Sequence, residues 1–162
     1  MKVVSNSSPL IALTRVNHLL LLQRLYSELY LPAAVWHEVV VQGRGQPGAA
    51  AVQGAPWIVR SAIRNAPLVL SLTQDLGAGE AEAIVLAQEL PADLLIVDER
   101  HAREKARRLG IPVIGVLGVL LEAKARRLLP AVRPVVDDLK NIAGFHSAPQ
   151  LMAEVLRQAG ES

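Results

Sequence analysis

The sequence predicts an α/β domain with a mainly parallel sheet, and two observations support this fold class. Short apolar runs alternate along the chain with longer segments whose apolar residues recur at helical spacing. The run at residues 93–97 shows no polar alternation, which is typical of a parallel strand covered by helices on both faces. The chain has 162 residues, which is the length of one domain. We therefore expect a single domain over residues 1–162.

The first predicted strand covers residues 2–5, where two valines form an apolar centre. The segment Asn6–Pro9 that follows is typical of a helix start, because small polar residues cap helices and proline suits the first turn. Apolar residues then recur at helical spacing as far as Val16 and again over residues 19–29.

A second strand is predicted at residues 30–31 and ends at Pro32, which begins a helix that reaches Val41. Residues 43–54 are rich in glycine, alanine and glutamine, so we expect a loop or a mobile segment that connects helices. Residues 57–59 form a third apolar run and predict a strand.

The second half of the chain alternates more regularly. Its strands are predicted from continuous apolar runs, and its helices from apolar residues three and four positions apart. In chain order these elements are a helix at 78–90, a strand at 93–97, a basic helix at 100–109, a strand at 112–114, and helices at 115–128, 132–143 and 149–159.

Composition excludes several classes of chemistry. The chain has no cysteine, which removes disulfides, thiolate metal sites and cysteine nucleophiles, and this fits a cytoplasmic location. Aromatic residues make up 3% of the chain, which predicts an aliphatic core and argues against a base-stacking platform. A net charge of +2 permits a nucleic-acid partner without requiring one. The longest apolar stretch, residues 109–121, is shorter than the ~20 residues that span a membrane, so no membrane partner is expected.

Polar residues that follow the predicted strands or begin helices are the candidate site, because open parallel sheets bind ligands at the carboxyl ends of their strands. These side chains offer only oxygen, which suits Mg²⁺ or Mn²⁺. Carboxylates that gather closely repel one another unless a cation lies among them. The candidates are Asn6, Ser7, Glu38, Glu80, Asp98 and Glu99.

Each of these residues also has a purely structural interpretation. Asn6 and Ser7 could be helix caps, Glu80 could be a first-turn partner of the helix dipole, and Glu38 could be a solvated charge on a helix. The pair at 98–99 could be an N-cap and a first-turn acid. Only convergence of the four segments would make a site, and spacing alone leaves both interpretations open.

A basic face is predicted on the helix at residues 100–109. Arg100, Arg103 and Arg107 share a face at spacings of three and four. This face is either a solvated helix surface or a rim that follows the phosphates of RNA and makes binding sensitive to salt.

Five segments, in order, carry a family resemblance. Val3–Leu13 (VVSNSSPLIAL) resembles the opening of PIN-domain proteins, in a prokaryotic branch related to the toxin nucleases of VapBC-type toxin–antitoxin pairs. Leu31–Val39 (LPAAVWHEV) is similar to the second motif of that branch, and Leu76–Ile84 (LGAGEAEAI) is similar to the third. Leu95–Arg103 and Gly115–Leu121 resemble the fourth and the fifth.

The resemblance implies a three-layer α/β/α fold and an acidic cluster that binds Mg²⁺ or Mn²⁺. It also implies metal-dependent cleavage of RNA, often by a homodimer that an antitoxin neutralises. By motif, Glu38, Glu80 and Asp98 match acidic metal-site positions and would be catalytic, with Glu99 as an adjacent candidate ligand.

Three further residues are assigned by the same motifs. Ser7 matches the hydroxyl residue beside the first acid, and Arg103 would face a substrate phosphate unless it is a solvated helix charge. Asn6 stands where PIN nucleases usually carry aspartate; its amide oxygen can bind Mg²⁺ but brings no negative charge, so weaker metal binding is expected. The segment Gly115–Gly118 also shows no aspartate for a late acidic position.

The leading hypothesis is therefore a Mg²⁺- or Mn²⁺-dependent ribonuclease of the PIN type, the toxin of a toxin–antitoxin pair. One alternative is a degenerate PIN domain that binds protein or RNA without cleaving it. Another is a different carboxylate-and-metal enzyme, such as a phosphatase.

Overall fold

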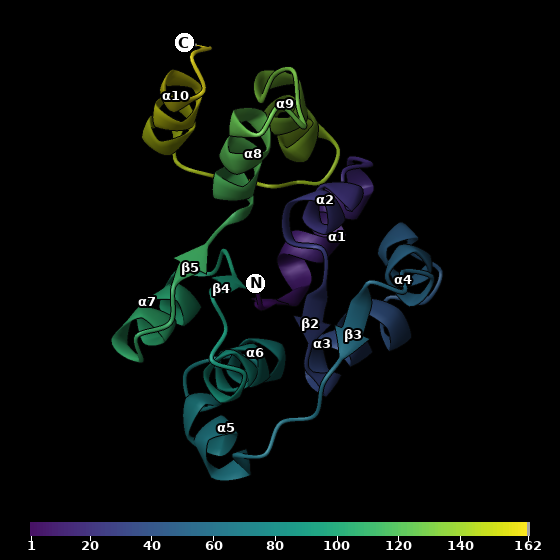
Figure 1. The fold of residues 1–162 in the computed structure, drawn as a ribbon, viewed down its shortest axis with the longest axis vertical. Helices are drawn as coiled ribbons and strands as arrows, with labels where there is room; N and C mark the ends of the chain where they lie inside the picture. Colours follow the sequence, from purple (N-terminus) through teal and green to yellow (C-terminus); the bar gives the residue numbers. More distant parts are fainter. Residues whose placement is uncertain (162) are drawn as a thin grey trace.

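The computed structural model describes residues 1–161 and places five parallel strands of this range in one sheet, in the order β3-β2-β1-β4-β5 (Figure 1). Ser5 is paired with Ile96 across β1 and β4, and Leu31 with Arg60 across β2 and β3. The strands are β1 (Val3–Ser5), β2 (Leu29–Leu31), β3 (Ile58–Arg60), β4 (Leu94–Ile96) and β5 (Val113–Ile114).

Helices cover both faces of the sheet and confirm the predicted three-layer α/β/α fold. In Figure 1, α5 and α6 lie on one side of the strands, and α1, α2, α8 and α9 lie on the other. The helical elements are α1 (Ser7–Arg15), α2 (Leu20–Tyr26), α3 (Ala33–Trp36), the π-helix η1 (His37–Val41), α4 (Pro47–Gln53), α5 (Ala66–Leu72), α6 (Ala78–Glu89), α7 (Arg100–Arg108), α8 (Val116–Ala125), α9 (Arg133–Asn141) and α10 (Pro149–Gln158).

The strand order explains this division. The chain runs from β1 outward to β2 and β3, and then crosses back to β4 on the other side of β1 and continues to β5. Crossovers between parallel strands are right-handed, so a change of direction moves the connecting helices to the opposite face. The two halves of the chain therefore meet between β1 and β4.

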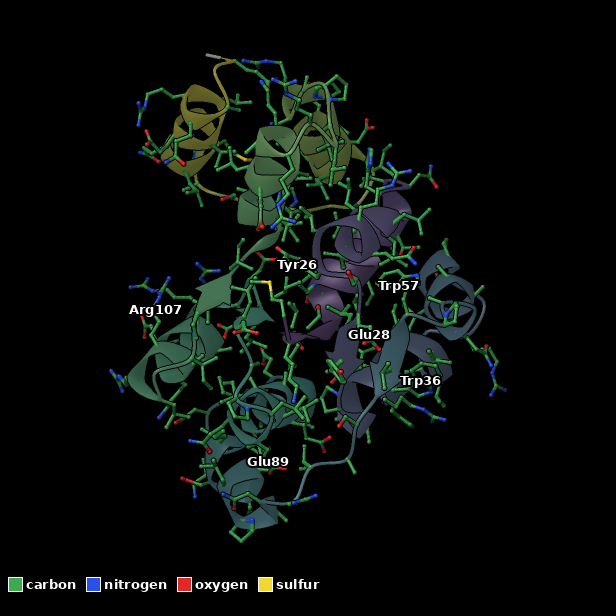
Figure 2. The ribbon with its side chains drawn as sticks, viewed as in Figure 1. Tyr26, Glu28, Trp36, Trp57, Glu89 and Arg107 are labelled. Carbon is green, nitrogen blue, oxygen red and sulfur yellow. The ribbon has the colours of Figure 1, made fainter. Side chains whose placement is uncertain are left out.

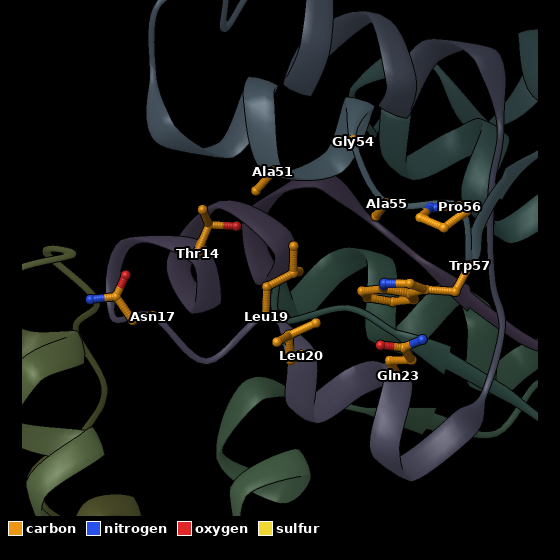
Figure 3. Close-up of a pocket in the computed structure, with 10 residues that line it drawn as sticks. All are labelled: Thr14, Asn17, Leu19, Leu20, Gln23, Ala51, Gly54, Ala55, Pro56 and Trp57. Atoms are coloured by element: carbon orange, nitrogen blue, oxygen red, sulfur yellow. The ribbon is translucent and has the colours of Figure 1, made fainter.

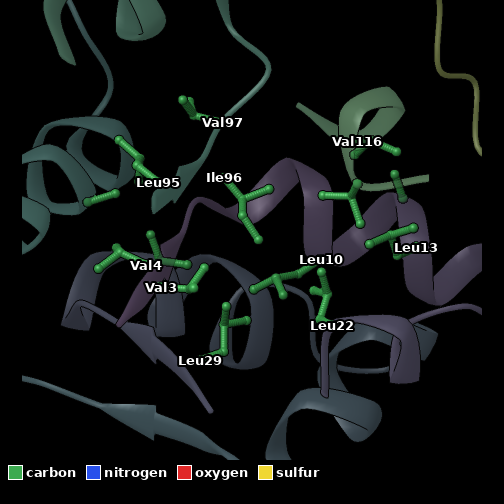
Figure 4. Close-up of a cluster of buried hydrophobic side chains, with 14 of the residues drawn as sticks. Val3, Val4, Leu10, Leu13, Leu22, Leu29, Leu95, Ile96, Val97 and Val116 are labelled. Atoms are coloured by element: carbon green, nitrogen blue, oxygen red, sulfur yellow. The ribbon is translucent and has the colours of Figure 1, made fainter. Parts of the chain in front are cut away.

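The core is aliphatic, as the low aromatic content predicts. Val3, Val4, Leu95 and Ile96 of the two central strands are fully buried, and Leu10 of α1 packs over them (Figure 4). Within residues 1–161, no helix combines the length and the apolar character needed to cross a bilayer.

The expected loop at residues 43–54 is wrong, because α4 occupies Pro47–Gln53. Alanine favours helix more than any other residue, proline fits the first turn, and Val52 is fully buried. The predicted single helix from Pro32 to Val41 is two elements, α3 and η1. No element was expected where α5 lies, at Ala66–Leu72.

Polar contacts fasten the carboxyl-terminal helices. Glu161, directly after α10, accepts hydrogen bonds from Lys124 Nζ at 2.8 Å and from the Val132 amide at 2.7 Å. These bonds hold the pKa of Glu161 at about 2, with the lysine as the largest cause. On the opposite side of α8, the Tyr26 hydroxyl donates to Glu122 Oε2 at 3.0 Å and joins α2 to α8.

Candidate functional site

The candidate site lies where the strand order reverses, at the carboxyl ends of β1 and β4. The Asn6 amide donates to the carbonyl of Ile96 at 3.0 Å, so the chain leaving β1 stays beside the chain leaving β4. Parallel sheets open a crevice at this point, because the two connecting segments depart to opposite faces. We call this side of the sheet the carboxyl edge.

Asn6 has an unsatisfied side chain at this edge. It holds the N-cap position of α1, but its side chain makes no capping hydrogen bond and is 5% exposed. Its Oδ1 is the one buried side-chain polar atom in residues 1–161 without a hydrogen-bond partner. A buried acceptor left unpaired costs roughly 1–3 kcal/mol, and this is typical of an atom that binds an ion or a water. Asn6 therefore occupies the cap position that the sequence allows, but its side chain does not cap the helix.

Glu38 is held by Ser7, the residue that follows Asn6. The Ser7 hydroxyl donates to Glu38 Oε2 at 2.9 Å, and Ser7 is 5% exposed. Glu38 lies on the π-helix η1, an irregular helix type that is frequent at functional sites. Its carboxylate occupies the space where a side chain at Gly79 would stand. Glu38 is thus half-buried and held, and the interpretation as a solvated helix charge is wrong.

Helix α6 brings Glu80 toward the same carboxylate. Glu80 Oε1 accepts a hydrogen bond from the Gly77 amide at 3.0 Å, which is the first-turn role that the sequence allows. Burial raises the pKa of Glu80; the Gly77 amide opposes this, and the negative charges of Glu99 and Glu38 raise the pKa further. The negative charges of Glu38 and Glu99 therefore each act on Glu80.

A second contact fixes α6 against α3, the helix that leads into η1. Glu82 Oε1 on α6 accepts from the Ala34 amide at 2.9 Å, at the first turn of α3. The carboxylate satisfies an amide that has no partner within its own helix. The bond therefore holds α6, which carries Glu80, beside the segment that continues from α3 to Glu38 on η1.

Asp98 leaves β4 and is held by the start of α8. Its Oδ1 accepts from the Val116 amide at 3.1 Å, and its carboxylate lies against Gly115, where a side chain would collide with it. Burial raises the pKa of Asp98, while the Val116 amide and the positive charge of Arg103 lower it. Glu99, in contrast, caps α7 by accepting from the Ala102 amide at 2.8 Å.

Arg103 lies beside Asp98 rather than in free solvent. Its Nη1 donates to the carbonyl of Val97 at 2.9 Å. Burial, and then the neighbouring charge of Arg107, lower its pKa, and Asp98 raises it. A cavity of about 410 Å³ opens beside Asp98 and Arg103 and continues to His146, in the connection to α10. Arg107 itself is exposed (Figure 2). Arg100 pairs with Glu104 at 3.3 Å.

The donor set fits a hard divalent cation in its chemistry. Every candidate offers oxygen, and the Asn6 amide oxygen is free to accept a ligand. Among the described residues, however, no group of three or more acidic, histidine or cysteine side chains lies close enough to hold a metal ion. An ion would therefore be shared between the amide oxygen and few carboxylates, or would draw Glu80 inward.

The sequence did not identify the small residues that make this site possible. Gly79 and Gly115 leave the space that Glu38 and Asp98 occupy. In the sequence, Gly79 directly precedes an acidic residue and Gly115 follows a predicted strand. Such a glycine predicts only a turn, because the sequence does not show which distant side chain packs against it.

An open, largely apolar cavity of about 470 Å³ lies at the opposite edge of the sheet (Figure 3). Leu19, Leu20 and Trp57 line it together with the end of α4, and its lining includes no acidic residue or histidine. It therefore offers no chemistry to the candidate site.

Comparisons with known proteins agree with this architecture. The family profile of DUF3368, a family of PIN domains, matches residues 2–161. A solved structure of a PilT N-terminus domain protein from the hyperthermophilic archaeon Sulfolobus solfataricus P2 is similar to the chain, with a TM-score of 0.53 and 21% identity. The match covers 76% of this chain and 93% of the archaeal one. A comparison with curated proteins found no match. The chain belongs to the PIN-domain family.

Proposed function

We propose that this chain is a Mg²⁺- or Mn²⁺-dependent endoribonuclease that hydrolyses RNA phosphodiesters. PIN domains are in general metal-dependent nucleases. The observation that supports the proposal most is the buried, unpartnered Asn6 oxygen at the edge where Glu38 and Asp98 also lie. A buried acceptor beside carboxylates is what a divalent ion would satisfy.

The chain's own residues divide the work. Asn6, Glu38, Glu80 and Asp98 would hold the ion, with Glu99 beside them. The bound ion would supply a more acidic water and stabilise negative charge on the phosphate. The Ser7 hydroxyl would keep the Glu38 carboxylate in place through its hydrogen bond to Oε2.

Arg103 would bind the phosphate of the substrate. Its guanidinium is held by the carbonyl of Val97 at 2.9 Å, at the wall of the cavity beside Asp98. A fixed guanidinium is pre-organised for phosphate oxygens, because its planar fork of donors loses little freedom on binding. The Val116 amide orients the Asp98 carboxylate in turn.

Cleavage of RNA by matched variants tests the proposal. Glu38→Gln and Asp98→Asn keep the shape of each side chain and remove its charge, and Glu28→Gln is a control on an exposed residue at the opposite edge (Figure 2). With Mn²⁺, the wild type and Glu28→Gln should cleave RNA, EDTA should stop the reaction, and the two site variants should be at least about 100-fold slower. Equal cleavage by all four proteins would overturn the assignment.

The second candidate function is a degenerate PIN domain that binds RNA or protein without cleavage. The neutral Asn6 favours it, as does the lack of a three-carboxylate group within residues 1–161. Titration calorimetry separates the two. Binding of Mn²⁺ that Asp98→Asn weakens supports the nuclease, and undetectable binding at millimolar Mn²⁺ supports the degenerate domain.

We also propose that the nuclease is the toxin of a toxin–antitoxin pair, that it acts in the cytoplasm and that it forms a homodimer. The sequence motifs support the toxin role. Exposed apolar side chains such as Leu20 and Leu70 are available for an antitoxin or a second copy. Expression of the chain with and without the protein of a neighbouring small reading frame would test the toxin role by growth arrest. Light scattering would test the dimer.

A further inference from the structure

A polar groove of about 690 Å³ lies on the side of the α3–η1 segment away from Glu38. Trp36 and Val40 line the groove. Residues four apart in a helix share a face, whereas residues two apart point to opposite sides, so Glu38 points away from the face that carries Trp36 and Val40. The Glu38 carboxylate turns instead toward Ser7. The groove and the candidate site are therefore on two sides of one short helical segment.

The groove is positively charged. Arg44 lines it from the turn that follows η1, and Arg60 lines it from the carboxyl end of β3. Among residues 1–161, no acidic side chain lines the groove. Neither arginine forms an ion pair with any residue from 1 to 161, and both are exposed. Their charges are thus available to an anion.

An aromatic ring lies beside these charges. The guanidinium of Arg60 stacks on the Trp36 indole, 4.5 Å from the ring centroid. Stacking orients the guanidinium and leaves its edge donors free for phosphate oxygens. Indole and guanidinium planes are also the surfaces on which unpaired bases stack.

We propose that this groove binds an unpaired nucleotide of an RNA strand, with its base against the Trp36–Arg60 stack and a phosphate on Arg44 or Arg60. Gln46 and Gln53 line the same groove and present amide groups that can hydrogen-bond to base edges. The inference rests on the proposed ribonuclease function and adds to it a nucleotide site in this groove, from which an RNA strand would pass across η1 to Glu38. The low aromatic content excludes an extended stacking platform, and a single indole provides one stacking position.

Binding in EDTA tests the groove without cleavage. The probe is a labelled single-stranded oligoribonucleotide of about six nucleotides, measured by fluorescence anisotropy. Arg60→Gln and Trp36→Ala should each weaken binding by about tenfold. Arg24→Gln, an exposed charge on α2 at the other edge, should change it less than about twofold. Duplex RNA of the same length should bind more weakly than the single strand.

Intrinsic fluorescence gives an independent readout. Trp57 is 8% exposed and lies in the cavity at the opposite edge (Figure 3), so Trp57→Phe leaves Trp36 as the reporter. RNA should quench the fluorescence of Trp57→Phe, and it should leave that of Trp36→Phe unchanged. Quenching of the buried Trp57 alone would contradict the proposal.

Several outcomes would overturn the inference. One is wild-type affinity in both Arg60→Gln and Trp36→Ala. Another is that a poly-glutamate peptide binds as tightly as RNA and loses affinity in the same variants, because the groove would then be a site for an acidic protein. If Asp98→Asn loses cleavage while Arg60→Gln has the KM of the wild type, the proposed role of the groove is wrong and the proposed nuclease activity stands. If the wild type binds RNA through Trp36 without cleaving it, the groove stands and the nuclease fails.

Discussion

Replacing Gly79 with alanine should separate the stability of the fold from the arrangement of the candidate site. A Cβ at this position would overlap Glu38 Oε1, and it would lie 2.8 Å from the carboxyl carbon of Glu38 and 3.1 Å from its Oε2. Ordinary contact begins at 3.4 Å, so the carboxyl carbon must move by at least about 0.6 Å and Oε1 must move further. The atoms that must move are at the far end of a flexible side chain, so the backbone can stay in place.

The magnitudes follow from these contacts. Alanine is favoured over glycine by about 1 kcal/mol inside a helix. The displaced carboxylate loses the 2.9 Å bond from Ser7, which is a loss of about 1 kcal/mol. The two terms nearly cancel, and we expect the free energy of unfolding to stay within about 1 kcal/mol of the wild type. A displacement approaching 1 Å at a reacting group costs about 100-fold in rate.

Gly48→Ala is a matched control. Gly48 is the second residue of α4 as Gly79 is the second residue of α6, and a Cβ there would meet the Ile11 side chain at an ordinary 3.8 Å. Urea unfolding should give similar stabilities for both variants, while RNA cleavage with Mn²⁺ should fall only in Gly79→Ala. Full activity in Gly79→Ala would refute the role of the Glu38 position, and a drop in stability above about 3 kcal/mol would refute the claim that the carboxylate can move freely.

Three further predictions concern pH and stability. The pKa of Glu161 in the folded chain is about 2, below its value in the unfolded chain, so Glu161 stabilises the fold at pH 5 and above and this stabilisation is lost as the pH falls toward 2. Glu161→Gln should therefore flatten the acid side of a stability–pH curve measured by urea unfolding. The pKa of Asp98 is raised, so protons compete with a metal ion for this carboxylate at a higher pH than they would for an ordinary aspartate. The affinity for Mn²⁺, measured by calorimetry, should therefore decline as the pH falls, and the decline should be smaller in Asp98→Asn. Tyr26→Phe removes the hydroxyl that donates to Glu122 at 3.0 Å and should cost about 1 kcal/mol, seen as a loss of about 2–4 °C in Tm by circular dichroism.

The fold follows from the sequence where burial determines the pattern. Residues 93–97 and 2–5 contain the two central strands because a strand covered on both faces must be apolar throughout. The error at residues 43–54 arose because alanine and glycine carry little hydrophobic signal. The burial of Val52 against α1 and η1 stabilises α4, and such a contact between distant segments has no local signature.

The candidate site is only partly readable in the sequence. The acidic residues could be chosen because they follow strands or begin helices, and Glu38, Glu80 and Asp98 do lie at one edge of the sheet. What separates a cap from a site residue is the partner of each oxygen. Glu99 bonds to an amide of its own helix, whereas Asn6 Oδ1 has no partner, and only coordinates reveal that difference.

Crystals soaked in Mn²⁺ and measured at the manganese absorption edge would show where the chain binds the ion. We expect an anomalous peak bound by Asn6 Oδ1 and the carboxylates of Glu38 and Asp98, and we expect this peak to disappear in Asp98→Asn. A peak elsewhere on the molecule, or none at millimolar Mn²⁺, would contradict this expectation.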